Sequence, residues 1–492
     1  MDLAELVANL DVTGDMATDG PPVRICDLTE DSRSVVPGSL FVARQGQFHD
    51  GHAYAAQAID EGAVAILTDR PMDVGVPVIV ARDLPRTLAV MAERFFGHPS
   101  ATLRLCGVTG TNGKTTIAHL VHSILNAEGV RCGLMGTIEI DDGSERSRAS
   151  LTTAPAIEIS RSLALMLESG CEGAVLEASS HALDQERVGA LSFDIAVFTN
   201  LSRDHMDYHQ TMEAYAEAKA RLFERLGPEG VAIVNADDPA HERMVRDCRA
   251  RVVRCTMGEG DHRVRILGES FSGMSLQMTG GFGDIEARVG FIGAHNAMNV
   301  LQATCAAHAF GLDASEIRRG LELAPVVPGR LERVDTRADD IRVLVDFAHT
   351  DQALSRVLET VRSVMREGRL WVVFGCGGDR DRGKRPLMAQ AVEAHADVCV
   401  LTSDNPRRER PNAIITDVLE GFRDRTRVEV QVDRDRAIRF AIEEAAPGDV
   451  VVIAGKGHET EQIISDGAGG VLTLHFDDRE IARGALRDRA SS

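Results

Sequence analysis

The segment GVTGTNGKTT, residues 107–116, combines residue types that hold phosphate in proteins. It follows an apolar stretch and opens a helical pattern, so glycine backbone amides and a helix N-terminus can face a phosphate group. In such a loop Lys114 reaches a β- or γ-phosphate and Thr115 offers its hydroxyl to magnesium. The GxxxxGK[ST] spacing is incomplete, because Val108 stands where its first glycine belongs. The alternative is a glycine-rich turn with a surface lysine. We predict a nucleotide-binding loop made of Gly110, Thr111, Asn112, Gly113, Lys114, Thr115 and Thr116.

Two further stretches supply groups that can bind magnesium, and both end predicted strands of the same sheet. LEASSH contains Glu177, and FTNLSRDHMDYH contains Asp204, His205, Asp207 and His209. Taken singly, each of these residues also fits a surface turn or a satisfied core histidine. Their joint occurrence at two strand ends beside a phosphate loop favours a metal site.

A lysine lies within the apolar face of the next predicted helix, TMEAYAEAKARLFERLG, residues 211–227. Tyr215, Leu222 and Phe223 share that face by their spacing, and Lys219 falls among them. Burial lowers the pKa of a lysine and enlarges its neutral, nucleophilic fraction. A neutral amine can capture carbon dioxide as a carbamate, which places an anion near metal and phosphate. The alternative is a side chain that covers the apolar face and keeps its ammonium in water.

Strand and helix patterns alternate along most of the chain, which is typical of parallel sheets covered by helices. Ligands bind outside the carboxyl ends of such strands. The first predicted set of strands is LRLCGVT, GAVLEAS, DIAVFTN and VAIVN, and the second is IRVLVDFA, RLWVVFGCGG, DVCVLTSD, VEVQVD and DVVVIAGKG. We expect the loops after the second set to gather around one cleft, at residues 347–350, 375–385, 403–410 and 455–459.

The fold class predicted from this alternation is α/β with three domains. Residues 1–99 are expected to form a small mixed α/β N-terminal domain. Residues 100–328 are expected to form a central parallel-sheet domain that carries the phosphate loop, and residues 329–492 a Rossmann-like C-terminal domain.

Composition excludes several classes of protein. The 492 residues have a formal net charge of −21, which argues against broad binding of nucleic acid or anionic membranes. Nine cysteines without a CxxC pair indicate free thiols in a reducing compartment. The N-terminal residues lack the pattern of a signal peptide, and no apolar run of about 18 residues is long enough to span a membrane. We expect a cytoplasmic monomer whose partners are small molecules.

Together these segments resemble the Mur ligase family, the ATP-dependent enzymes that add amino acids to the peptidoglycan precursor. The resemblance covers nearly the whole chain. It includes, in order, DSRSVVPGSLFVARQGQFHDGHAYAAQAIDEGA, GVTGTNGKTT, LTTAPA, LEASSHALDQERV, FTNLSRDHMDYH, EAKARLF, GAHNAMNVLQA, PGRLERV, VDFAHT, FGCGGDRDRGKRP, TSDNPRRERP and AGKGHE.

The resemblance implies an ATP- and magnesium-dependent ligase that forms an acyl phosphate, with closure of the third domain. Lys114, Glu177, His205 and Lys219 are then the catalytic residues, with Lys219 carbamylated. Magnesium is held by Thr115, Glu177, His205 and Lys219. Further implied contacts are Ser32 and His49 to uridine diphosphate; Thr152, Thr153, Ser179, Gln185 and Arg187 to the muramoyl dipeptide; Asn296, Arg330 and Asp346 to the nucleotide; and Arg380, Asp404, Asn405, Pro406, Arg407, Gly455 and Glu459 to the incoming amino acid.

The motif DNPR decides which amino acid is expected. It resembles the motif of family members that add meso-diaminopimelate to UDP-N-acetylmuramoyl-L-alanyl-D-glutamate. Diaminopimelate has a distal carboxylate that lysine lacks, and the guanidinium of Arg407 can bind a carboxylate through two parallel hydrogen bonds, with Arg380 in support. The alternatives are the same ligase with L-lysine, a folylpolyglutamate-synthase-like ligase, and a P-loop nucleotide switch. Phe347, where tyrosine is common in the family, is expected to alter nucleotide stacking slightly.

Overall fold

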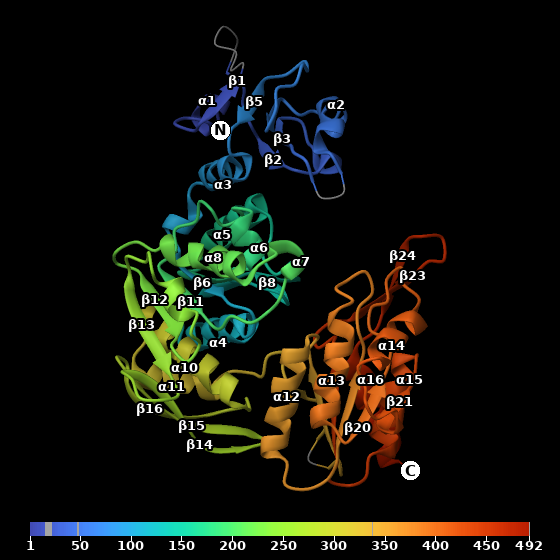
Figure 1. Ribbon diagram of the computed structural model, residues 1–492. Helices are drawn as coiled ribbons and strands as arrows, with labels where there is room; N and C mark the ends of the chain where they lie inside the picture. Colours follow the sequence, from blue (N-terminus) through green and yellow to red (C-terminus); the bar gives the residue numbers. More distant parts are fainter. Residues whose placement is uncertain (15–21, 47–48, 337, 492) are drawn as a thin grey trace. The chain divides into compact units, whose positions relative to one another are not determined.

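The computed structural model describes residues 1–14, 22–46, 49–336 and 338–491 (Figure 1). They form two compact units, one of residues 1–255 and 302–313, the other of residues 256–301 and 314–492. Among the described residues, no helix is both long and apolar enough to cross a membrane. The domain boundaries after residues 99 and 328 stay predictions.

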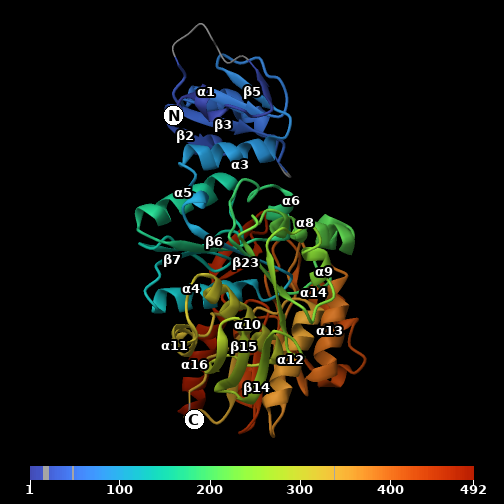
Figure 2. The same ribbon diagram turned by 90° about the vertical axis from the view of Figure 1, so that its left-hand side faces the viewer.

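The first unit begins with a five-stranded sheet in the order β1-β5-β4-β3-β2. Strands β2 to β5 pair in parallel, and β1 is antiparallel to β5. Both faces are covered, since Leu40 and Val42 of β3 join one apolar cluster while Phe41 and Ala43 join another. Helix α3 runs along this sheet (Figure 2). The bounds are α1 Leu3–Leu6, β1 Val12–Gly14, β2 Asp27–Thr29, η1 Ser32–Ser34, β3 Ser39–Ala43, η2 Gly51–Tyr54, α2 Ala55–Asp60, β4 Ala65–Thr68, β5 Val78–Ala81, α3 Leu84–Phe95 and η3 Pro99–Ala101.

A second sheet in this unit carries the predicted phosphate loop. Its strands run in the order β13-β12-β11-β6-β10-β7-β8-β9, parallel from β13 to β7 and antiparallel beyond. The predicted strands are confirmed as β6, β10, β11 and β12. The bounds are β6 Arg104–Thr109, α4 Lys114–Ala127, β7 Cys132–Met135, β8 Glu139–Asp141, β9 Arg146–Arg148, α5 Ala156–Glu168, β10 Gly173–Glu177, α6 Ser180–Asp184, β11 Ile195–Phe198, α7 Met206–His209, α8 Met212–Glu224, β12 Val231–Asn235, α9 His241–Met244 and β13 Arg251–Thr256.

The register of this sheet places three loops together. Strand β6 lies between β10 and β11, with Val108 opposite Glu177 and Thr109 opposite Phe198. The carboxyl ends of β6, β10 and β11 therefore meet at one edge of the sheet, where an open α/β sheet binds its ligands.

The second unit begins with three antiparallel strands, so the strand–helix alternation expected throughout residues 100–328 is wrong for residues 262–289. These strands are β14 His262–Ser270, β15 Gly273–Gly280 and β16 Gly283–Val289. Burial alternates along β15, and Gly273 and Gly283 have φ values of +117° and +94°. Such glycines let consecutive strands reverse direction without a crossover helix. Helices α10, Ala294–Ala309, and α11, Ala314–Leu323, follow.

The C-terminal part of the second unit is a six-stranded sheet in the order β17-β18-β22-β19-β20-β21, parallel except for β17. Along β19, Leu370, Val372 and Phe374 face one apolar cluster, whereas Trp371 and Val373 face another. This is the doubly covered sheet that was predicted. The bounds are β17 Glu332–Arg333, β18 Arg342–Asp346, α12 Asp351–Val364, β19 Leu370–Phe374, α13 Lys384–His395, β20 Val398–Leu401, α14 Pro411–Leu419, η4 Arg425–Arg427, β21 Val428–Val430, α15 Arg434–Glu444, β22 Val450–Ala454, β23 Glu461–Ser465, β24 Val471–His475 and α16 Asp478–Ala490.

Candidate active site

The predicted phosphate loop connects β6 to α4, as the sequence indicated. Gly113 has a φ of +91° and directly precedes the helix, which begins at Lys114. Gly110 has a φ of +144°, and a Cβ at this position would lie 1.8 Å from Oγ1 of Thr199. Only glycine therefore allows the loop to approach the end of β11 this closely.

Thr199 and Asn200, which sequence reasoning missed, anchor the loop. The Thr111 amide donates to the Asn200 carbonyl at 2.8 Å, and the Asn112 amide donates to Asn200 Oδ1 at 3.0 Å. The Thr199 hydroxyl donates to the Asn112 carbonyl at 2.6 Å. The signal available in the sequence was the position of these two residues directly after a strand that borders β6.

Two lysines converge beneath the loop. Lys114 Nζ donates to the carbonyl oxygens of Gly110 and Thr111, both at 2.9 Å. Lys219 Nζ, from α8, donates to the same Gly110 oxygen at 2.8 Å and lies 4.4 Å from the ring centroid of Tyr215. Lys219 is only 1% exposed, so the burial that its helical position suggested is confirmed. Burial lowers the pKa of Lys219 well below its usual value, and the charge of Lys114 lowers it further.

Glu177 is the fully buried carboxylate at the end of β10. Its Oε2 accepts from the hydroxyls of Thr115 and Thr137, each at 3.0 Å, and its Oε1 accepts from the Thr137 amide at 2.8 Å. The structure thus brings together two predicted magnesium ligands, Thr115 and Glu177. Thr137 was missed, because it lies on the β7–β8 connection, where the sequence carries no motif.

These groups are suited to magnesium. Carboxylate and hydroxyl oxygens are the ligands that Mg²⁺ takes in nucleotide sites. Within the described ranges, no three His, Cys, Asp or Glu side chains are grouped as a metal site would require. Magnesium would therefore rely on Thr115, Glu177, phosphate oxygens and a further anion, and the residues present fit that requirement.

His205, the other predicted magnesium ligand, lies at the start of α7 with a φ of +55°. Its amide donates to Asp204 Oδ1 at 2.9 Å, and its ring centroid is 4.7 Å from that of His181. Burial lowers the pKa of His205. In the described part of the chain no hydrogen bond or ion pair joins His205 to Glu177, so His205 stays a prediction as a ligand.

The residues predicted to hold the muramoyl dipeptide form one hydrogen-bonded group next to Glu177. The hydroxyl oxygens of Thr152 and Thr137 lie at hydrogen-bond distance, 3.1 Å apart. The Thr153 hydroxyl donates to the Glu177 carbonyl at 2.7 Å, and its Oγ1 lies at hydrogen-bond distance, 3.1 Å, from Ser179 Oγ. Arg187 donates to the Thr153 carbonyl and, through two nitrogens, to Gln185 Oε1. All five predicted residues are therefore near the carboxyl ends of the same strands.

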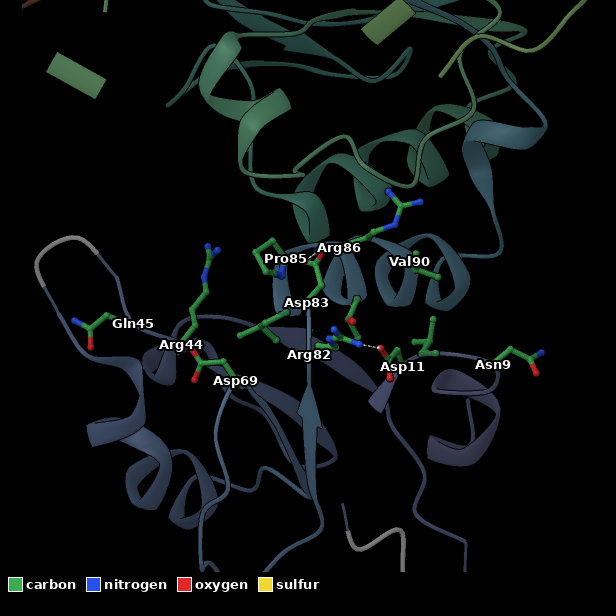
Figure 3. Close-up of a pocket in the computed structure, with 13 residues that line it drawn as sticks. Asn9, Asp11, Arg44, Gln45, Asp69, Arg82, Asp83, Pro85, Arg86 and Val90 are labelled. Carbon is green, nitrogen blue, oxygen red and sulfur yellow. Dashed lines mark hydrogen bonds and ion pairs between the residues drawn. The ribbon is translucent and has the colours of Figure 1, made fainter. Parts of the chain in front are cut away.

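Ser32 and His49, the predicted uridine-diphosphate contacts, are placed separately. Ser32 is buried and donates to Gln57 Oε1 at 3.4 Å, whereas His49 is exposed. A pocket of about 830 Å³ opens at the carboxyl ends of β3 to β5, and Arg44, Asp69 and Arg82 line it (Figure 3). Neither Ser32 nor His49 is among the residues that line it.

The predicted nucleotide contacts of the second unit are Asn296, Arg330 and Asp346. Asn296 is buried, donates to the Ile292 carbonyl at 2.8 Å and accepts from Asn299 Nδ2 at 3.1 Å. Asp346 accepts from the amides of Leu331 and Ala348, each at 2.7 Å, and burial raises its pKa. The Arg330 guanidinium lies 4.9 Å from the Phe347 ring centroid. Phe347 therefore stacks on a predicted nucleotide contact.

The predicted amino-acid pocket gathers residues from the ends of β19, β20 and β22. Asn405 Nδ2 donates to Glu459 Oε2 at 2.9 Å. Gly455 has a φ of +118°, and a Cβ there would lie 2.6 Å from Oδ2 of Asp404. Burial raises the pKa of Asp404, but the charges of Arg434 and Lys456 outweigh it, so the pKa is below its usual value.

Arg380 and Arg407 both lie beside Gly377, in the loop after β19. A Cβ on Gly377 would lie 3.1 Å from Arg407 Nη1 and 3.7 Å from Arg380 Cγ. Burial lowers the pKa of Arg407, and the charge of Arg380 lowers it further. Lys456, which is fully buried and donates to Glu459 Oε2 at 3.0 Å, was missed although it lies inside the motif AGKGHE.

Comparisons with known proteins agree with this geometry. The patterns described as Mur ligase family catalytic domain, Mur ligase middle domain and Mur ligase glutamate ligase domain match residues 25–95, 108–307 and 329–457. A UDP-N-acetylmuramoyl-L-alanyl-D-glutamate–2,6-diaminopimelate ligase from Geobacillus thermodenitrificans is 43% identical over 94% of this chain and 95% of its own length. The chain belongs to the Mur ligase family.

Solved structures support the fold. A structure of a UDP-N-acetylmuramoyl-L-alanyl-D-glutamate–2,6-diaminopimelate ligase is 33% identical, with a TM-score of 0.69 and complete coverage of both chains. A Mycobacterium tuberculosis folylpolyglutamate synthase is 22% identical over 75% of this chain and 92% of its own, with a TM-score of 0.62. The second likeness concerns the fold alone. The family patterns occur in the order expected of a three-domain α/β ligase.

Proposed function

We propose that this chain is an ATP-dependent ligase that joins meso-diaminopimelate to the D-glutamyl residue of UDP-N-acetylmuramoyl-L-alanyl-D-glutamate in the cytoplasm. The observation that carries the proposal is the placement of two guanidinium groups, of Arg380 and Arg407, near the carboxylates of Asp404 and Glu459, because the charges of all three neighbours act on the pKa of Arg407. An amino acid with a second carboxylate and a free amine complements both sets of groups.

The reaction begins when the γ-carboxylate of the D-glutamyl residue attacks the γ-phosphorus of ATP. The products are ADP and an acyl phosphate. Lys114 neutralises charge on the transferred phosphoryl group. The hydrogen-bonded residues next to Glu177 orient the acceptor; they are Thr152, Thr153, Ser179, Gln185 and Arg187. The amine of diaminopimelate then attacks the acyl carbon, phosphate leaves, and the amine loses a proton as the amide forms.

Thr115, Glu177, His205 and a carbamylated Lys219 are the residues that would hold magnesium. The metal supplies positive charge to phosphate oxygens during transfer. The carbamate forms when the neutral Lys219 amine attacks carbon dioxide and releases one proton. Its support is the burial of Lys219 beside Lys114, because the carbamate places a negative charge next to the positive charge of Lys114.

The test is phosphate release from ATP in the presence of magnesium and the UDP-linked dipeptide. Parallel reactions contain meso-diaminopimelate, L-lysine or no amino acid. Release only with diaminopimelate is expected. Release with lysine would keep the ligase and overturn the account of the pocket, whereas release without any amino acid would contradict the proposed reaction.

Arg407→Ala tests the selectivity directly. Its matched control is Arg408→Ala, which removes the adjacent arginine, whose side chain is 63% exposed and pairs with Asp379. Arg407→Ala is expected to raise the KM for diaminopimelate by about 100-fold, the worth of a bidentate carboxylate contact. Arg408→Ala is expected to leave it within about threefold, as for an exposed ion pair.

A further inference from the structure

The loop that carries Arg407 is joined to the loop after β19 by direct contacts. The Gly378 amide donates to the Asn405 carbonyl at 2.9 Å, and Arg407 Nη1 donates to the Gly378 carbonyl at 2.9 Å. A Cβ on Gly378 would lie 2.0 Å from the Pro406 carbonyl oxygen. The two loops are therefore in backbone contact, and the position of one sets the position of the other.

Arg407 itself has an unusual backbone conformation, with a φ of +51°. For a residue other than glycine this left-handed conformation is costly and persists only where the surroundings impose it. The turn closes through a hydrogen bond from the Glu409 amide to the Pro406 carbonyl at 3.0 Å. Glu409 is thus the residue whose placement fixes the end of the turn.

The Glu409 side chain is held by an extensive set of donors. Arg385 donates to its two oxygens, from Nη2 to Oε1 at 2.8 Å and from Nη1 to Oε2 at 3.1 Å. The Asp379 amide donates to Oε1 at 2.6 Å, and Arg382 donates to Oε2 at 3.0 Å. The hydrogen bonds from Arg385 hold the pKa of Glu409 below its usual value.

Arg385 connects this carboxylate to the body of the second unit. Its side chain is fully buried in α13, while that of Glu409 is 13% exposed. Arg385 also donates to the Gly377 carbonyl at 3.2 Å and to Asp417 Oδ2, in α14, at 2.7 Å. A buried guanidinium with carboxylate partners on two segments is a rigid anchor, because it cannot return to water without breaking both pairs.

We propose that Glu409 and Arg385 are positioning residues for Arg407, and that the ion pair between them sets the preference for an amino acid with a distal carboxylate. Neither side chain needs to touch the amino acid. The inference deepens the proposed function and rests on it. Because Arg407 acts on a part of the substrate remote from the reacting amine, loss of its position raises KM rather than lowering kcat.

The test compares Glu409→Gln with the matched control Asp417→Asn. Both variants replace one carboxylate partner of Arg385 by an amide, but only Glu409 belongs to the Arg407 turn. Glu409→Gln is expected to raise the KM for diaminopimelate about tenfold, as for a lost charged contact, with kcat and the KM for ATP nearly unchanged. Asp417→Asn is expected to leave all three values near those of the wild type.

Glu409→Asp is the second variant, because it keeps the charge and changes only the reach of the side chain. A KM for diaminopimelate between the wild-type and Glu409→Gln values supports positioning. Equal losses of kcat in Glu409→Gln and Asp417→Asn would overturn the inference and indicate a general structural role for Arg385. An unchanged preference for diaminopimelate over lysine in both Glu409 variants would also overturn it.

A readout that needs no substrate separates this inference from the proposed function. Phenylglyoxal modifies accessible arginines, and mass spectrometry of peptides gives the rate at Arg407. The rate is expected to rise in Glu409→Gln and to stay unchanged in Asp417→Asn. If the modification rate at Arg407 rises in Glu409→Gln but the wild-type enzyme uses lysine, the positioning role is kept and the proposed substrate is contradicted. Equal modification rates in all three proteins would contradict the positioning role.

Discussion

Lys114 and Lys219 donate hydrogen bonds to one and the same acceptor, the carbonyl oxygen of Gly110, at 2.9 and 2.8 Å. One of these amines is buried, and within the described residues no carboxylate lies within ion-pair distance of Lys219. Two adjacent ammonium groups on one neutral oxygen repel each other, so the buried amine is the one that is expected to lose its proton. A neutral amine next to a cation is the state that reacts with carbon dioxide.

Activity should therefore depend on dissolved carbon dioxide. Protein kept free of carbon dioxide is expected to lose activity at least tenfold and to regain it on addition of bicarbonate. The reason is that the carbamate on Lys219, whose negative charge balances Lys114, is lost and then restored. The measurement is phosphate release, accompanied by native mass spectrometry for the added CO₂. Lys219→Ala is the control and should be inactive whether or not bicarbonate is present. Full activity of Lys219→Ala, or no response of the wild type, would contradict the carbamate.

Gly110→Ala should disrupt nucleotide binding. The new Cβ would lie 1.8 Å from Thr199 Oγ1, so the loop must move away from β11 and Lys114 loses its position. Phosphate release is expected to fall at least about 100-fold, the usual cost of misplacing a catalytic loop.

Gly129→Ala is the matched control for Gly110→Ala, because Gly129 also has a positive φ, +84°, but no atom within 4 Å of its Cβ position. It is expected to cost only about 1 kcal/mol of stability and no activity. Similar activities of the two variants would show that the contact with Thr199 is unimportant.

The local features of the site could be predicted from the sequence, but its long-range contacts could not. The strand, loop and helix around Lys114 follow from apolar periodicity and glycine spacing, which act within a few residues. Thr137 and Asn200 were missed because their roles depend on the order of the strands in the sheet. Strand β6 lies between β10 and β11, and β7 pairs with the other edge of β10. Residues 262–289 were mispredicted because glycine turns and alternating burial there compete with the general strand–helix pattern.

The buried pair Arg434–Asp478 is expected to be essential for stability of the second unit. Both side chains are fully buried, and Arg434 donates to the two oxygens of Asp478 at 2.8 and 2.7 Å. Asp478→Asn leaves the buried guanidinium without its hydrogen-bonded carboxylate, with only the more distant charges of Asp404 and Glu459 to offset it, and should lower the free energy of unfolding by about 3 kcal/mol. Asp488→Asn is the control, because its partner Arg439 and Asp488 itself are 42% and 77% exposed. It should cost less than about 0.5 kcal/mol in urea denaturation. Equal effects of the two substitutions would contradict the importance of burial.

His295 should make stability depend on pH in the mildly acidic range. Burial, followed by the charge of Arg356, lowers its pKa from 6.5 to about 4. Between these two values the unfolded chain binds a proton that the folded chain does not, so stability is complete above pH 6.5 and falls as the pH drops toward 4. The loss attributable to His295 is at most about 3 kcal/mol.

The measurement is the urea midpoint of unfolding at a series of pH values. His295→Gln is expected to reduce the slope between pH 6.5 and 4, because it removes one of the buried histidines that take up a proton on unfolding. His475→Gln is the control. The hydrogen bond to Glu480 raises the pKa of His475, so well below pH 6.5 this histidine is protonated in both states and contributes no slope. A wild-type slope in His295→Gln, or a flattened slope in His475→Gln, would contradict the role of His295, since the proton uptake would then belong to another group.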